Sequence, residues 1–353
     1  MAPNPLGLTL ELSASSRVEV VELTSRLSGE QRDALRAYPR CLYWSAHTTA
    51  GFLDPSLIRR LGSGQVPAYV ETLRRIFPER AGYAHDRLDR RRDLDPAQRA
   101  VEPLNGDSHL AFIAGALTPC VIHPNRSDET VCFVDLDGVN AGRPRRRLTR
   151  VIGFHRETLA GHLRVRVPLS PHSIDSINLK DPKLGVYPQL SEFAARAGIR
   201  HGRMHIALAR GERDAGLTIN EFETLLMKHD LAAVLRNPLR FMAEGTRDAL
   251  MNPRAVPEKF AGYARYDFVR VFNSGLDTLG LHGSRLERLF AALVVVPAAR
   301  MFRIRRSINL LVGEGADGHA GPVEGVYQSP ILIQCSRAPG DVRELDVTLY
   351  RLE

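Results

Sequence analysis

Three short segments in the first half of the sequence each place a histidine among small or polar residues. They read His47-Thr48-Thr49-Ala50, Tyr83-Ala84-His85-Asp86 and Asn105-Gly106-Asp107-Ser108-His109. Neutral imidazoles can bind a divalent metal such as zinc and leave one coordination position for water or substrate. Without a metal, the same side chains could serve as acid, base and phosphate donor. We therefore expect His47, His85 and His109 to form one catalytic or metal-binding site.

The sequence around these histidines recurs about half a chain later, in the same order. The landmark pairs are Ala81–Asp86 with Ala261–Asp267, Ser108-His109-Leu110 with Ser284-Arg285-Leu286, and Thr49–Phe52 with Asp214–Leu217. A repeat of this length predicts two copies of one domain, because each copy must build its own core. We expect residues 1–168 to form a domain that retains the histidines, and residues 172–353 to form a degenerate repeat.

Hydrophobic periodicity predicts strands flanking two helices in each half, which indicates an α+β fold. Ser108 is expected to cap a helix over His109–Leu117, so that His109 lies in the first turn beside free backbone amides, a natural anion site. The other predicted elements of the first half are strands Leu8–Leu12, Val18–Leu23, Leu42–Ser45, Cys120–His123, Val131–Leu136 and Leu148–Phe154 and helix Tyr69–Phe77. Those of the second half are strands Arg203–Ala209, Ser307–Val312, Ile331–Cys335 and Glu344–Leu349 and helices near Leu231–Met251 and Ser284–Leu293.

The three histidine segments resemble the motifs of the YjbQ-like family, also called the secondary thiamine-phosphate synthase family. The basic residues Arg145 and Arg146 before a final strand are similar to the family's ending. In the second half, Asn220-Glu221 and His229-Asp230 resemble two further elements of the family. The resemblance implies two tandem domains, each a β-sandwich-like antiparallel sheet arrangement with two main helices. It also implies a homotrimer, with a dimer as the second expectation, since sheet packing about a threefold axis would cover exposed strand edges.

The two halves keep complementary parts of the motif set. The first half reads Phe52-Leu53-Asp54-Pro55 where the Asn-Glu element should be, and the second half has Glu212, Arg265 and Arg285 at the histidine positions. The two arginines could bind phosphate through their guanidinium forks, or could pair with Glu212 in a plugged pocket. The complementary pattern predicts a composite site in which Glu221 approaches the histidines of the first half.

Composition places the chain among soluble globular proteins. The 353 residues are 44% hydrophobic and carry a net charge of +8. We find no signal peptide, no membrane-spanning segment and no paired cysteine motif, so we expect a cytoplasmic protein with free thiols. The arginine clusters lack a nucleic-acid-binding signature, so they are predicted to be solvated and nucleic acid is an unlikely partner. These clusters are Arg90–Arg92, Arg143–Arg147 and Arg303–Arg306.

Two classes of function follow from these patterns. The first is an enzyme, a transferase or lyase of specialised metabolism, acting on a phosphorylated or otherwise anionic small molecule. The alternative is a binding protein that keeps the fold and an anion pocket without turnover. The expected catalytic residues are His47, His85, His109 and Glu221, and a divalent metal, if present, would be held by the three histidines. The expected substrate-binding residues are Thr48, Asn105, Ser108, Arg145, Asn220, His229, Arg265 and Arg285.

Overall fold

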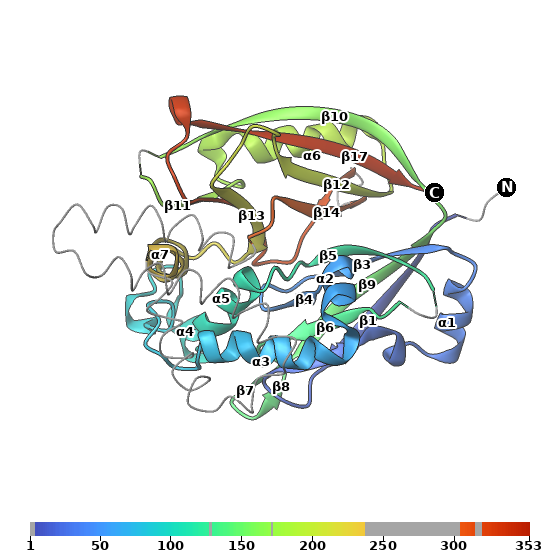
Figure 1. Cartoon of the computed structure of the whole chain (residues 1–353), viewed down its shortest axis with the longest axis horizontal. Coiled ribbons are helices and arrows are strands. Elements are labelled where there is room, and N and C mark those ends of the chain that lie inside the picture. The colour runs from blue at the N-terminus through green and yellow to red at the C-terminus, as the bar shows by residue number, and fades with distance from the viewer. Residues whose placement is uncertain (1–3, 127–128, 171, 237–303, 315–319) are drawn as a thin grey trace, which may run out of the picture.

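Antiparallel strands of the first half form two sheets that pack face to face. The computed structural model describes residues 4–126, 129–170, 172–236, 304–314 and 320–353 (Figure 1). One sheet has the order β1-β9-β3-β5 and the other β2-β6-β4. Leu10 and Leu12 of β1 alternate with exposed residues and meet Phe133 of β6 in the core between the sheets, as expected for strands with one buried face. The strands are β1 Leu6–Ser13, β2 Glu19–Glu22, β3 Arg40–Ser45, β4 Ala50–Phe52, β5 Cys120–Pro124, β6 Cys132–Asp135, β7 Val139–Asn140, β8 Arg143–Pro144 and β9 Arg146–Phe154.

The second half repeats this strand order. Its sheets run β10-β17-β12-β14-β15 and β11-β16-β13, and they enclose a separate core. In Figure 1 the sheet that contains β10 and β17 lies above the strands of the first half. The strands are β10 Glu157–Pro168, β11 Asp175–Asn178, β12 His201–Leu208, β13 Ala215–Asn220, β14 Ser307–Glu314, β15 Ala320–Val323, β16 Ser329–Gln334 and β17 Val342–Leu352.

Short helices fill the space beside the sheets. In α3, Val66, Tyr69, Val70 and Leu73 are buried at the spacing of one helical face. Every residue of α5 is buried. The helices are α1 Gly29–Leu35, α2 Pro55–Leu61, α3 Val66–Ile76, α4 Pro96–Val101, α5 Gly106–Ala114, α6 Val186–Ala197 and α7 Leu231–Arg236, and a π-helical turn, Leu225–Asp230, leads into α7.

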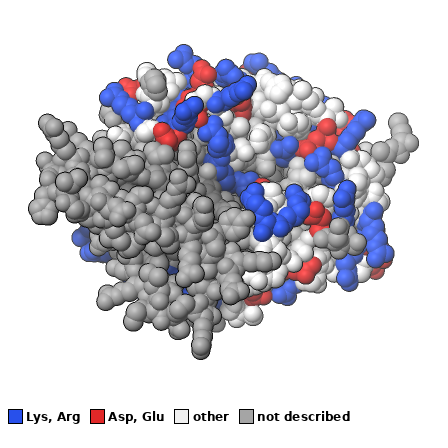
Figure 2. All heavy atoms as spheres, viewed as in Figure 1, with Lys and Arg blue, Asp and Glu red and all other residues white. Residues whose placement is uncertain are grey.

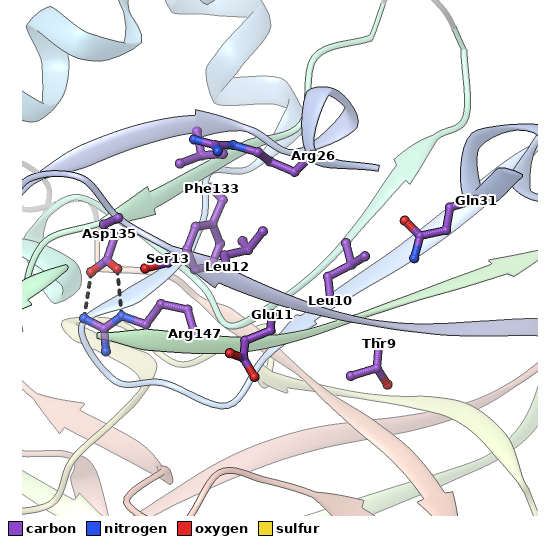
Figure 3. Close-up of a pocket in the computed structure, with 12 residues that line it drawn as sticks. Thr9, Leu10, Glu11, Leu12, Ser13, Arg26, Gln31, Phe133, Asp135 and Arg147 are labelled. Carbon is purple, nitrogen blue, oxygen red and sulfur yellow. Dashed lines mark hydrogen bonds and ion pairs between the residues drawn. The ribbon is translucent and has the colours of Figure 1, made fainter. Parts of the chain in front are cut away.

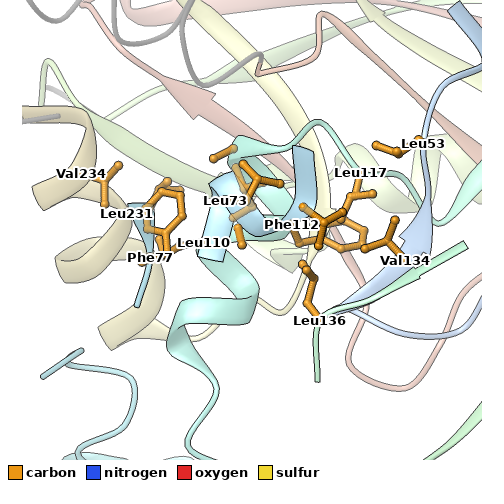
Figure 4. Close-up of a cluster of buried hydrophobic side chains, with 14 of the residues drawn as sticks. Leu53, Leu73, Phe77, Leu110, Phe112, Leu117, Val134, Leu136, Leu231 and Val234 are labelled. Atoms are coloured by element: carbon orange, nitrogen blue, oxygen red, sulfur yellow. The ribbon is translucent and has the colours of Figure 1, made fainter. Parts of the chain in front are cut away.

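A third core joins the two halves. Figure 4 shows Leu231 and Val234 of α7 beside Phe77, which follows α3, and Leu110 of α5. Ile331 of β16 belongs to the same cluster. The halves therefore share buried apolar surface, and the loop between α3 and α4 is held against the turn that precedes α7.

The strand and helix predictions of the first half match the structure apart from helix ends. The predicted N-cap at Ser108 is wrong, because α5 begins at Gly106 with Asn105 as its N-cap residue and Ser108 lies inside the first turn. The predicted helix at Leu231–Met251 is described only as α7, and the predicted helix Ser284–Leu293 lies outside the described residues.

The chain passes from the sheets of the first half to those of the second half before the predicted boundary at Pro168. Strand β10 precedes that residue, yet it pairs with β17 over its whole length. Only His155 and Arg156 separate β9 from β10. Pro168 is the last residue of β10, so a proline that suggests a linker in the sequence here ends a strand.

The arginine clusters are not uniformly solvated. Arg91 and Arg147 are each only 2% exposed, whereas Arg90, Arg92 and Arg146 are exposed. On the face seen in Figure 2, acidic side chains lie among the basic ones wherever residues are described. All four cysteines are buried free thiols, as expected. No helix in the described part of the chain is long and apolar enough to cross a membrane.

Candidate active site

Two of the three predicted histidines form a buried pair. The rings of His85 and His109 have centroids 5.1 Å apart at an interplanar angle of 69°. Both residues are at most 1% exposed. His109 is carried by α5, and His85 by the loop between α3 and α4. That loop can approach α5 because Gly106 has no side chain, since a Cβ there would lie 2.9 Å from Cβ of Tyr83.

The second half holds the His85 loop in place. The carboxylate of Asp230, at the end of the π-helical turn, accepts the backbone N–H groups of Ala84 at 2.8 Å and His85 at 2.9 Å. The sequence singled out His229 as the binding residue of this pair, but His229 is exposed and Asp230 is buried. Asp230 therefore positions the His85 loop, whereas the His229 side chain is exposed to solvent.

The hydrogen-bond partners of His109 fix its tautomer. Asn220 donates from Nδ2 to the carbonyl of Thr48 at 3.0 Å, and its Oδ1 accepts the backbone N–H of Glu221 at 2.8 Å. The same Oδ1 lies 2.7 Å from Nδ1 of His109, so Nδ1 must carry the proton. Nε2 is then left with its lone pair. It makes no hydrogen bond to any residue described, and the Glu221 carboxylate lies 3.6 Å away.

His85 has a partner for its Nδ1 atom in either protonation state. Glu223 Oε2 lies 3.3 Å from Nδ1 and Arg91 Nη1 lies 3.0 Å from it. The protonated ring can donate to Glu223, whereas the neutral ring can accept from Arg91. On the other side of the ring, Nε2 lies 3.1 Å from Oδ1 of Asn105. His85 can therefore gain or lose a proton without leaving Nδ1 unsatisfied.

Burial and charge move the pKa values of the two rings in opposite directions. Burial lowers the pKa of His85, but the hydrogen bond to Glu223 and the charge of Glu221 outweigh it, so the pKa is raised. Burial and the neighbouring His85 hold the pKa of His109 well below its usual range. Burial raises the pKa of Glu221. The pair thus combines one ring whose neutral form is favoured with one ring whose protonated form is favoured relative to a free histidine.

Arg91 is the charged centre of the site and was not predicted. Its Nη2 lies 3.2 Å from Glu221 Oε1 and 2.7 Å from Asp93 Oδ2, and its Nη1 lies 3.5 Å from Glu102. Glu223, the partner of His85, was also missed. Its carboxylate accepts backbone N–H groups at the start of the π-helical turn. Glu223 therefore holds this turn in place and also raises the pKa of His85.

Asn105 links the pair to a second set of charges. Its Nδ2 donates to the buried Asp137 carboxylate at 2.8 Å, and Arg145 also hydrogen-bonds that carboxylate. Asn105 thus contacts His85 directly, and Arg145 is joined to it through Asp137.

The predicted anion site at the start of α5 is already filled by protein. The Gly106 N–H donates to the Asp86 carboxylate at 2.9 Å, and the N–H of His109 bonds to Asn105. The Ser108 hydroxyl donates to the carbonyl of Leu136 at 2.7 Å, so it holds α5 against the chain that follows β6. Carboxylate and carbonyl groups of the protein therefore already accept the N–H groups of Gly106, Ser108 and His109.

His47 does not share the environment of the other two histidines. Its Nε2 accepts the backbone N–H of Leu148 at 2.8 Å. Burial and the nearby Arg147 and Arg145 lower its pKa to about 3. The neighbouring residue Thr48 contributes its backbone carbonyl, through Asn220, rather than its hydroxyl.

The three histidines as arranged do not fit a three-imidazole metal site. His47 Nε2 and His85 Nδ1 each face an N–H donor, the latter from a guanidinium group that would repel a cation. Within residues 4–236 and 304–353, gaps excepted, no group of three or more His, Cys, Asp or Glu side chains is arranged to hold a metal ion.

The second half lacks an equivalent histidine pair among its described residues. Glu212 pairs with the buried Arg343 at 2.7 Å. Arg265 and Arg285, the other two expected residues, lie outside the part of the chain that the structure describes.

Several solved structures align with this chain at low identity. A YbjQ-like protein of unknown function from Sulfolobus solfataricus P2 aligns with 13% identity and a TM-score of 0.32, covering 56% of this chain and 99% of its own. A conserved protein of the yjbq family from Clostridium acetobutylicum aligns with 16% identity and a TM-score of 0.24, covering 41% and 97% respectively. A hypothetical protein from Aeropyrum pernix K1 aligns with 17% identity and a TM-score of 0.28, covering 43% and 99%. No protein-family model and no curated protein sequence matches the chain.

Proposed function

We propose that this chain is an enzyme, a transferase or lyase, that moves protons on a small molecule bound beside His85 and His109. The observation that carries the proposal is the pair of buried imidazoles whose pKa values are moved in opposite directions. Such divergence is how active sites assign an acid and a base at one pH. In this proposal His109 Nε2 is the general base and protonated His85 is the acid.

Glu221 is the third catalytic group in this proposal. Its carboxylate faces His109 Nε2 at 3.6 Å, a separation that a substrate hydroxyl or a water molecule between them could bridge. Its burial and its raised pKa allow it to take up the proton that His109 removes. His47 is not part of this acid–base set, because its ring already accepts a backbone N–H.

We propose a phosphorylated or otherwise anionic small molecule as the substrate class. Arg91 and Arg145 both lie close enough to lower the pKa of His109, so the pair sits in the field of two guanidinium groups. Each of them is also paired with a carboxylate, so a bound anion would compete with Glu221 for Arg91 or with Asp137 for Arg145. The resemblance of the histidine segments to the YjbQ-like family supports the same class. A zinc ion would need ligands other than the three histidines, and elemental analysis of the purified protein tests for one.

Turnover can be tested without knowing the substrate. The protein is incubated in D₂O with a panel of small phosphorylated compounds, and deuterium incorporation and new products are followed by mass spectrometry. We expect turnover of at least one compound, reduced about 10²- to 10⁴-fold by His109→Gln and by His85→Gln. His201→Gln, a change at an exposed histidine of β12, is the matched control and should leave turnover intact. Saturable binding without turnover would favour the binding-protein alternative.

We further propose that the chain is a tandem-duplicated and diverged YjbQ-like protein and that it assembles as a homotrimer, with a dimer second. The matching strand orders of the two halves, to which the second half adds β15 at one edge, support the duplication. The long edge strand β10, with Leu159 54% exposed, supports assembly because unpaired strand edges are usually covered. The buried free thiols suit a cytoplasmic location. A monodisperse monomer in light scattering would contradict the assembly.

A further inference from the structure

A cavity of about 460 Å³ lies in the first half, between the edge strand β1 and strand β6. Figure 3 shows Leu12 and Phe133 on its apolar side and the paired Arg147 and Asp135 beside them. The side chains of Ser13 and Gln31 also line it. None of the residues of the histidine pair contributes to its wall, so the cavity is separate from the candidate active site.

Arg147 has one amino group to spare. Its Nε and Nη2 each donate to Asp135 at 2.7 Å, and Nη2 also donates to the carbonyl of Asp137 at 2.5 Å. Figure 3 shows the third nitrogen, Nη1, turned away from the Asp135 carboxylate. Across the described ranges, Nη1 has no hydrogen-bond partner, although Arg147 is only 2% exposed. Nη1 is not among the fully enclosed polar atoms that lack a partner, so it remains open to water or to the acceptor group of a ligand.

The corresponding arginine of the second half uses both of its amino groups, although its Nε is buried without a partner. Arg343 holds the same place in the strand order, near the start of β17, and is also 2% exposed. Its Nη1 donates to Glu212 and to the carbonyl of Arg213, and its Nη2 donates to the carbonyl of Ser336.

We propose that this cavity is a second ligand site, for a small neutral molecule with an apolar body and a carbonyl-type acceptor. The acceptor binds Nη1 of Arg147, and the apolar body packs on Leu12 and Phe133. The charge of Arg147 is already balanced by the bidentate Asp135, so burying a second anion there would bring repulsion from Asp135 without a free cation to offset it. Arg26, on the rim, is paired with Glu19. The ligand is therefore uncharged at this end. The site and its test do not depend on the proposed function.

Benzamide and benzoate are matched probes for this proposal, because they share a ring and differ in the charge of the acceptor group. Binding to the full-length protein is followed by ligand-observed NMR. We expect benzamide to bind with a dissociation constant on the order of millimolar, as befits a fragment of this size, and benzoate to bind more weakly. Ser13→Trp, at an exposed residue of β1, should fill the cavity and weaken benzamide binding about tenfold or more. Thr158→Trp, at an exposed position of the other edge strand β10, should leave binding unchanged.

Three results would overturn the proposal. If wild-type protein shows no saturable benzamide binding, the cavity is not a ligand site of this class. If Ser13→Trp keeps its melting temperature and binds benzamide like wild type, the ligand lies elsewhere. If benzoate binds more tightly than benzamide, the site recognises anions and the assigned ligand class is wrong.

Discussion

Glu221 Oε2 lies 3.6 Å from His109 Nε2, although the two residues belong to different halves of the chain. The two residues meet because strand β13 ends at Asn220, so that the next residue, Glu221, faces His109 of α5. Asn220 and Glu221 act on the same ring, the first by holding Nδ1 and the second by facing Nε2. The approach of Glu221 to the histidines is the contact that the complementary motif pattern predicts.

Removing the charge of Glu221 should lower the pKa of His85. The Glu221 carboxylate raises that pKa through its charge, so Glu221→Gln should shift the titration of His85 to lower pH. Imidazole ¹³C signals in an NMR titration measure the shift. Glu344→Gln, at a partly exposed residue of β17, is the control, and it should leave the His85 titration in place. An unchanged His85 titration in Glu221→Gln would remove Glu221 from the proposed acid–base set.

Replacing Arg91 should have the opposite effect on His85 and should also weaken the fold. Arg91→Gln removes a positive charge that lowers the pKa of His85, so that pKa should rise. It also leaves Glu221 and Glu223 without their buried cation, at a cost of about 3 kcal/mol in the free energy of unfolding. Urea denaturation measures the loss. The exposed neighbour Arg90 provides the control, since Arg90→Gln should change stability by less than about 0.5 kcal/mol.

Truncating Asn220 should release the tautomer of His109. In Asn220→Ala, Nδ1 of His109 and the carbonyl of Thr48 both lose their partner, so stability should fall by about 1 to 3 kcal/mol. The ¹⁵N shifts of the His109 ring should change from one tautomer to a mixture. Asn309→Ala tests the specificity of this effect, because Asn309 holds His205 in the same way in the other half. A single unchanged tautomer in Asn220→Ala would contradict the role assigned to Asn220.

His123 should make the protein sensitive to mild acid. It is fully buried, neither ring nitrogen has a partner in the described structure, and burial lowers its pKa to about 4. A lowered pKa in the folded state means that full stability is present above about pH 6.5 and is lost as the pH falls towards 4. The loss from this one group is about 2 kcal/mol at pH 5.

The replacement His123→Phe should therefore flatten the dependence of melting temperature on pH between 6.5 and 4. The T-shaped contact with Tyr43 leaves room for an aromatic ring of similar size. His201→Phe changes an exposed histidine and should keep the wild-type slope. A variant that loses stability with acid as steeply as wild type would show that other groups control the transition.

Local patterns were sufficient to predict most of the first half. The alternation of leucines in β1 and the spacing of Tyr69, Val70 and Leu73 in α3 are properties of neighbouring residues, so the sequence reports them directly. The first residue of α5 was harder to predict. Its N-cap residue Asn105 uses its side chain for His85 and Asp137 rather than for capping the helix. No local pattern carries that information.

The site was only partly predictable for a related reason. His85, His109, Asn220 and Glu221 stand in recognisable motifs, but Arg91 lies in a run of arginines that looks like a solvated surface. Its burial depends on carboxylates 130 residues away, which only the fold brings near. His47 shows the reverse case, since its motif is intact and its ring nitrogen is nevertheless used by the backbone of Leu148.

The two-residue connection between β9 and β10 has a consequence for how this site can vary. In an assembly of separate, identical chains, every copy must supply both the imidazoles and the carboxylates that face them. Here each imidazole always meets the carboxylate of its own polypeptide, at an effective concentration that dilution cannot change. A substitution in one half therefore leaves the sequence of the other half unchanged. The imidazole side and the carboxylate side of the site can accordingly change independently.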